Sequence, residues 1–371
     1  MNRPSVPGLR RTLVVLGTAL ATVAATLTVA TAPVAAAGSP DDYSGSDLWL
    51  RYVPVSDAKL LRDYRRAASA IVVQNADATK VHRHTADLAM APGSREKLVE
   101  TTLGAARDEL VRGLGGLLGQ SIPVTTVDAD RVPDGAVVVG TPASSPLVGR
   151  AIPAGELARV GDEGYLVRSV SSGRARFTVI AGNTDLGALY GTFAFLRLMQ
   201  TQKPVDHLRV AESPKIKHRL LNNWETERLY AGNNATGLGG VNGESGAVFN
   251  FAATGASAGR NLPVILDRYL VMARALASLG INGITINNVN ADNAYLTSAR
   301  IAQEAALADA LRPYGIRLGL SIRYTAPTDS RFAPDTLTNS QLDPYGADFR
   351  GWWHRRPSRS RPPFRTSWVS P

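Results

Sequence analysis

Amide, aromatic and charged side chains follow three predicted strands in the second half of the sequence. The strand that starts at 219 leads into a tryptophan and an acid, the strand at 283–286 into three asparagines around a valine, and the strand at 316–322 into an arginine. A tryptophan face can stack on a sugar ring, amides donate and accept hydrogen bonds with hydroxyls, and a guanidinium can bind a carboxylate through two hydrogen bonds. The predicted substrate-binding residues are therefore Trp224, Glu225, Asn287, Asn288, Val289, Asn290 and Arg323.

Each of these three groups also has a purely structural interpretation. Trp224 could pack in a wall at a domain junction, with Glu227 and Arg228 as a solvated pair beside it. Asparagines are common in turns, and an arginine at a strand exit is more often a surface residue than a ligand. The residue pattern alone leaves both interpretations open.

Catalytic and metal-binding residues are harder to assign from the pattern. Hydrolysis of a glycoside needs two carboxyl groups that flank one bond, and Glu225 and Glu227 are the nearest local candidates. A separation of two positions does not by itself create that geometry, so we assign no catalytic residue. His82 and His84 have no companion ligands and the chain has no cysteine, so we expect no metal site and no cofactor.

The elements that must position these residues predict two α/β regions. In residues 47–205, strands at 70–73 and 136–140, a helix at 94–118 capped by Ser94, a hairpin at 164–181 and a helix at 184–199 predict a small N-terminal α/β domain. Residues 206–353 alternate strand, polar exit and helix, with helices at 263–279 and 298–312. That rhythm predicts the first part of a (β/α)8 TIM-type barrel, in which the active site lies at the carboxyl ends of the strands.

The two ends of the chain carry most of its positive charge. Residues 1–37 hold three arginines and 354–371 hold five, neither with an acid, so removing these charges from the formal total of +10 leaves +2 between them. A nucleic-acid partner is therefore not expected.

Residues 1–37 resemble a cleaved secretory signal rather than a stable membrane anchor, which predicts a secreted protein, with 38–46 as a polar linker. The Arg/Pro/Ser-rich residues 354–371 fit either a natural basic tail that binds a polyanion or an out-of-frame ending, and we favour the second.

Nine ordered motifs in residues 47–353 resemble the α-glucuronidases of glycoside hydrolase family 67. They lie at 48–52, 163–167, 180–193, 220–224, 227–232, 278–283, 287–291, 311–316 and 342–344. The resemblance implies removal of glucuronic acid, or its 4-O-methyl ether, from xylan-derived oligosaccharides with inversion of configuration and without a cofactor. It also implies that Trp224 and residues 287–290 line the uronic-acid pocket.

The sequence departs from the family pattern at positions that bear on activity. Asn223 stands where the family usually has histidine, and the stretch 233–259 is longer than expected. The resemblance places the general acid and the base beyond Trp353, where no residue of this sequence matches them. We therefore expect an inactive polypeptide, with a secreted, non-catalytic oligosaccharide-binding protein as the alternative.

Overall fold

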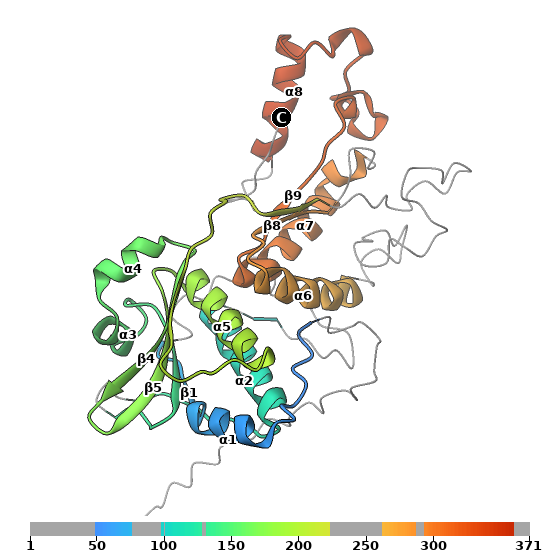
Figure 1. The fold of residues 1–371 in the computed structure, drawn as a ribbon. Helices are drawn as coiled ribbons and strands as arrows, with labels where there is room; N and C mark the ends of the chain where they lie inside the picture. Colours follow the sequence, from blue (N-terminus) through green and yellow to red (C-terminus); the bar gives the residue numbers. More distant parts are fainter. Residues whose placement is uncertain are drawn as a thin grey trace, which may run out of the picture. The chain divides into compact units, whose positions relative to one another are not determined.

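The computed structural model describes residues 49–75, 98–99, 101–127, 131–222, 262–286 and 293–359. In this part of the chain the first sheet has six strands in the order β2-β1-β3-β5-β4-β6 (Figure 1). Strands β1, β2, β3 and β5 run parallel, whereas β4 is antiparallel to both β5 and β6. The bounds are β1 Ala70–Val72, β2 Val124–Thr125, β3 Ala136–Gly140, β4 Tyr165–Ser172, β5 Ala175–Gly182 and β6 Arg209–Glu212.

Helices cover both faces of this sheet, because successive strand residues point to opposite sides. Ile71, Val137 and Ile180 pack with α2 Thr102–Leu118 and α5 Asp185–Gln200. Val72, Val138 and Val179 pack with α3 Pro146–Ala151 and α4 Ala154–Val160 on the other side (Figure 1). Full burial of each such side chain contributes about 1.5–3 kcal/mol. The predicted N-terminal α/β domain is thus a three-layer α/β/α arrangement, with α1 Ala58–Ala67 beside α2.

Local signals account for most of the element boundaries. Thr184 caps α5 through its side-chain oxygen, as the predicted helix at 184–199 requires, and the hairpin β4–β5 turns at Gly173, where φ is 59°. The prediction for α2 was wrong at its start. Leu98 and Val99 are not helical, and the helix begins at Thr102 because the Thr101 side chain accepts a hydrogen bond from the backbone N–H of Gly104.

The second half of the chain forms a separate parallel sheet in the order β7-β8-β9. Strand β7 is Leu220–Asn222, β8 is Gly283–Thr285 and β9 is Arg317–Gly319. Helix α6 Leu262–Ser278 precedes β8, and α7 Ser298–Leu311 precedes β9. Parallel neighbours in chain order with helices between them are the arrangement with which a (β/α) barrel begins, so the predicted fold class is confirmed.

Residues after β9 form short helical turns and a final helix. The turns are η5 Ala326–Thr328, η6 Ser330–Phe332 and η7 Asn339–Gln341, and the helix is α8 Ala347–Arg359. Ala326, Phe332 and Trp352 are buried together in a small cluster of their own.

The predicted boundaries at 205 and 353 fall inside this architecture. Strand β6 lies past residue 205 yet pairs with β4 in the first sheet, and α8 continues through residues 354–359. The domain division itself stays a prediction. The predicted signal, the linker and the end of the tail from residue 360 lie outside the described residues. Within the described ranges, no helix has both the length and the apolar character needed to cross a bilayer.

Candidate functional site

The candidate site is the edge of the second sheet at which β7, β8 and β9 reach their carboxyl ends. Asn222 and Thr285 end adjacent strands, and the Thr285 hydroxyl donates to Asn222 Oδ1 at 2.7 Å. Strand β9 ends at Gly319 beside Thr285. Because loops that follow parallel strands meet at this edge, the predicted sugar-binding segments all leave from it.

Six of the seven predicted binding residues lie outside the described residues. These are Trp224, Glu225, Asn287, Asn288, Val289 and Asn290, and for them the prediction stands unchanged. Arg323 is described and follows β9 in a turn, where its carbonyl accepts from the N–H of Ala326 at 3.0 Å. The residue is partly buried.

A polar cluster that the sequence analysis did not identify lies in the loops that follow β8 and β9. Asn293 Nδ2 donates to Asp329 Oδ2 at 3.0 Å, so a residue just after the predicted asparagine segment joins a loop that follows β9. Arg331 binds the same carboxylate through Nη2 at 2.7 Å and Nε at 3.0 Å. Asp329, Ser330 and Arg331 have no helical or strand periodicity, so their role as a contact between loops had no signal in the sequence.

The Asp329 carboxyl is fixed in its charged form. The side-chain hydrogen bond from Arg331 is the largest cause that lowers the pKa, to about 2, and the backbone of Arg331 and the side chain of Asn293 contribute as well. A general acid must hold a proton near the working pH, which Asp329 does not. It can accept hydrogen bonds and orient its neighbours, and these are the roles we assign to it.

Replacing Asp329 with asparagine is expected to remove a stabilising effect that depends on pH. The folded pKa of about 2 lies below the ordinary aspartate value of about 3.9, so the ionised carboxylate stabilises the fold above about pH 4, and that effect is lost as pH falls toward 2. The stability gap between wild type and D329N should therefore narrow from pH 5 to pH 3 in urea titrations. Asp206→Asn, at an exposed loop position, is the control, and a gap independent of pH would contradict the assignment.

Aromatic rings connect the turn after β9 with the last helix. Tyr324 is 50% exposed, and its ring centroid lies 5.0 Å from that of Phe349 on α8. Phe349 contacts Trp353 at 6.1 Å, and the buried Trp352 contacts Phe332 at 5.5 Å. The Tyr324 hydroxyl donates to the Leu342 carbonyl. These contacts hold the turn that carries Arg323 against α8.

The described residues give no support to metal chemistry. Within those ranges, no group of three or more histidine, cysteine, aspartate or glutamate side chains lies close enough together to hold an ion. The prediction of no metal and no cofactor for the whole chain stays a prediction.

Two family models match successive parts of the chain. The glycosyl hydrolase family 67 N-terminus matches residues 90–195, and the glycosyl hydrolase family 67 middle domain matches residues 198–359. The first model covers most of the first sheet and its helices, and the second covers β6 and all of the second sheet.

Curated relatives named as α-glucuronidases match over a large part of this chain. Alpha-glucuronidase A of Emericella nidulans is 29% identical over 309 residues, which is 83% of this chain and 31% of the relative. A probable α-glucuronidase A of Neosartorya fischeri is 31% identical over 67% of this chain and 26% of the relative. The chain thus spans about a third or less of the length of these relatives.

A solved structure of a family GH115 4-O-methyl-α-glucuronidase with specificity for decorated arabinogalactans is also similar. It is 16% identical, with a TM-score of 0.40, and the match covers 72% of this chain and 33% of that one.

Proposed function

The chain belongs to glycosyl hydrolase family 67, and from this premise we propose that it is an α-glucuronidase-type glycoside hydrolase. The observation that carries the proposal is the pair of family models that match residues 90–195 and 198–359 in order. We further propose that the substrates are xylan oligosaccharides with glucuronic acid, or its 4-O-methyl ether, as a side group. The polar edge at Asn222 and Thr285 supports a carbohydrate ligand, because neutral hydroxyls pair well with such groups.

The proposed reaction is hydrolysis with inversion. One carboxylic acid protonates the leaving oxygen while a carboxylate about 6.5–9.5 Å away activates water on the opposite face of the sugar. In this scheme Trp224 and residues 287–290 line the uronic-acid pocket, and Arg323 pairs with the uronate carboxylate. We assign neither the acid nor the base to a residue of this sequence.

The setting of the protein is part of the same proposal. The arginine-led apolar segment of residues 1–37 supports secretion, which would place the protein where plant polysaccharides are degraded. A near-neutral body between the two basic ends supports a carbohydrate partner rather than a nucleic acid.

The alternative is a secreted protein that binds oligosaccharides without cleaving them. It is favoured by the aromatic and amide residues at 224 and 287–290, which can bind a sugar without taking part in its cleavage. The two functions differ in what they require of the ligand. An α-glucuronidase site selects the uronic acid, whereas a site that holds the xylose chain binds decorated and undecorated oligosaccharides alike.

Calorimetry with uronic-acid-decorated and undecorated xylo-oligosaccharides tests the proposal. We expect the protein to bind the decorated oligosaccharide only. Arg323→Ala should lower the affinity by about tenfold or more, because it removes a charge-assisted hydrogen-bonded pair. Arg62→Ala, at an exposed position on α1, is the matched control and should change nothing. Equal affinity for both ligands would favour the alternative, and the absence of binding to either would overturn the proposal.

A further inference from the structure

The amino-terminal ends of the three strands in the second sheet are joined by a row of hydrogen bonds. Arg219 and Asn282 directly precede β7 and β8, and Arg317 is the first residue of β9. The N–H of Asn282 donates to the Arg219 carbonyl at 2.9 Å, and the N–H of Arg317 donates to the Asn282 carbonyl at 3.0 Å. Asn282 Oδ1 also accepts from the N–H of Arg219 at 3.0 Å. These bonds fix the register between the starts of the three strands.

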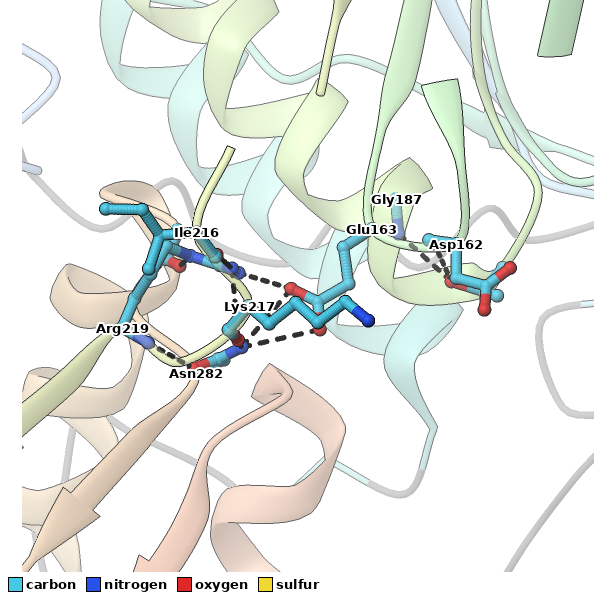
Figure 2. Close-up of polar contacts among 9 residues, drawn as sticks. Asp162, Glu163, Gly187, Ile216, Lys217, Arg219 and Asn282 are labelled. Carbon is cyan, nitrogen blue, oxygen red and sulfur yellow. Dashed lines mark hydrogen bonds and ion pairs between the residues drawn. The ribbon is translucent and has the colours of Figure 1, made fainter. Parts of the chain in front are cut away.

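Glu163, from the loop before β4 in the first sheet, contacts two residues of this hydrogen-bonded row, Arg219 and Asn282. Figure 2 shows its carboxylate between the side chains of Arg219 and Asn282. Arg219 Nη2 forms an ion pair with Glu163 Oε2, and Asn282 Nδ2 lies 3.4 Å from both carboxylate oxygens. The Arg219 and Glu163 side chains are only 17% and 25% exposed, so their attraction is less screened than that of a surface pair.

The other donors of Arg219 are used nearby, which fixes its guanidinium. Nη1 donates to the carbonyl of Ile216 at 2.5 Å, and Nε donates to the carbonyl of Gly280. Asn282 Nδ2 donates to the carbonyl of Lys217 at 2.7 Å (Figure 2). The segments of chain that lead into β7 and β8 are thereby held around one carboxylate.

The loop that carries Glu163 is itself tied to the start of α5. The Thr184 hydroxyl donates to the Asp162 carbonyl at 2.6 Å and accepts from the N–H of Gly187. A Cβ on Gly187 would lie 2.2 Å from the Gly164 carbonyl oxygen, so this close approach needs glycine. The loop that carries Glu163 is therefore held against the start of α5 by a hydrogen bond and a close backbone contact.

Contacts from α5 connect the loop that carries Glu163 to the start of the third strand, β9. A Cβ on Gly315, in the turn before β9, would lie 2.3 Å from Leu186 Cδ1. Tyr190 on α5 is buried near Glu163, Arg219 and Arg317, and burial followed by the Glu163 charge raises the pKa of Tyr190 to about 12. Its phenol remains neutral, and Glu163 is the acidic partner of Arg219 at this point.

We propose that Glu163 is a positioning residue that fixes where β7 and β8 begin, and so where their carboxyl ends present the sugar-binding segments. The proposal rests on the proposed function for the nature of the ligand. Each strand is only three residues long, or about 10 Å at roughly 3.3 Å per residue. A displacement of the first residue of a strand therefore also displaces the last one. A slip of one residue would also turn each side chain to the opposite face.

The matched pair of variants is Glu163→Ala and Glu156→Ala in the full chain. Glu156 pairs with Arg168 at 2.5 Å within the first domain and serves as the control, because its ion pair is similar but joins α4 to β4. We expect Glu163→Ala to raise hydrogen exchange of the amides in 219–222 and 282–285 by about tenfold, with little change in β4 and β5. Glu156→Ala should leave the amides of β7 and β8 unchanged.

Ligand affinity and rescue separate positioning from general stability. Glu163→Ala should weaken binding of the uronic-acid-decorated oligosaccharide by about fivefold, and Glu163→Gln should recover part of the loss because its amide oxygen still accepts from Asn282. An equal rise of exchange across both sheets, or no rise in 219–222 and 282–285, would overturn the proposal. If the wild type binds no oligosaccharide, the proposed function fails, while the exchange data still decide whether Glu163 positions the strands.

Discussion

Replacing Glu109 with alanine is expected to lower the free energy of unfolding by about 3–5 kcal/mol, the cost of leaving one charge of a buried ion pair without its partner. Glu109 on α2 and Arg274 on α6 are 3% and 2% exposed. Arg274 donates from Nε to Oε2 at 2.8 Å and from Nη2 to Oε1 at 2.9 Å, which is a two-point pair. The remaining position on Oε1 is taken by the Tyr52 hydroxyl at 2.5 Å.

The same residues connect the two halves of the chain. Helix α2 covers the first sheet and α6 precedes β8, so the loss of Glu109 leaves the Arg274 guanidinium buried at the contact between them. Tyr52 has a φ of 50°, a left-handed backbone that is costly for a side chain of this size, and its hydrogen bond to Glu109 helps to offset that cost. We therefore expect E109A to weaken both halves in one transition, measured by urea unfolding with fluorescence and circular dichroism.

The pH dependence of stability follows from the same site. Burial alone would raise the pKa of Glu109, but the charge and hydrogen bonds of Arg274 outweigh it and hold the pKa below its usual range. The pair therefore stabilises the fold above about pH 4.3, the ordinary glutamate value, and the effect is lost as pH falls below it. E109A should show a weaker loss of stability than the wild type on going from pH 5 to pH 3.

Two control variants separate the effect of the unpaired buried charge from a general loss of stability. Glu156→Ala removes a partly exposed ion pair and should cost much less than E109A, because solvent screens such a pair. Replacing Glu109 and Arg274 together with methionine leaves no unpaired charge, so it should cost less than E109A. A double variant as unstable as E109A would show that packing, rather than charge, accounts for the effect.

How much of the fold could be predicted depended on whether the signal was local. The strand predicted at 136–140 is a run of apolar residues and became the buried β3, and the helix predicted at 184–199 became α5. The pair of Glu109 and Arg274 spans 165 positions, and Arg274 follows the core residue Ala273 in a helix with an apolar stripe, so no local pattern identifies it. The same is true of Glu163, whose partners follow more than fifty positions later.

The candidate site shows the same limit. The barrel rule located the strand exits, and β7, β8 and β9 do end side by side. Which loop residues then meet depends on how the loops fold back, as the bond between Asn293 and Asp329 shows. Composition and spacing carry no information about such contacts, because loop conformation is set by the surrounding structure.

The 371-residue polypeptide is expected to release no measurable glucuronic acid from decorated xylo-oligosaccharides. We propose that this polypeptide supplies neither the general acid nor the base. Each typically contributes about 10²–10⁴-fold in rate, so the proposal implies a rate lower by at least about 10⁴. Among the residues that the structure describes, Asp329 follows β9 closely but is held ionised by Arg331 and cannot protonate a leaving group. The measurement is released uronic acid against a parallel assay of Emericella nidulans α-glucuronidase A. The prediction would be contradicted if the polypeptide released uronic acid, if Glu225→Gln abolished that release and if Glu156→Gln left it intact. Glu225 would then be a catalytic residue, because the loss of activity would follow from removing its carboxyl group and not from removing the carboxyl group of Glu156.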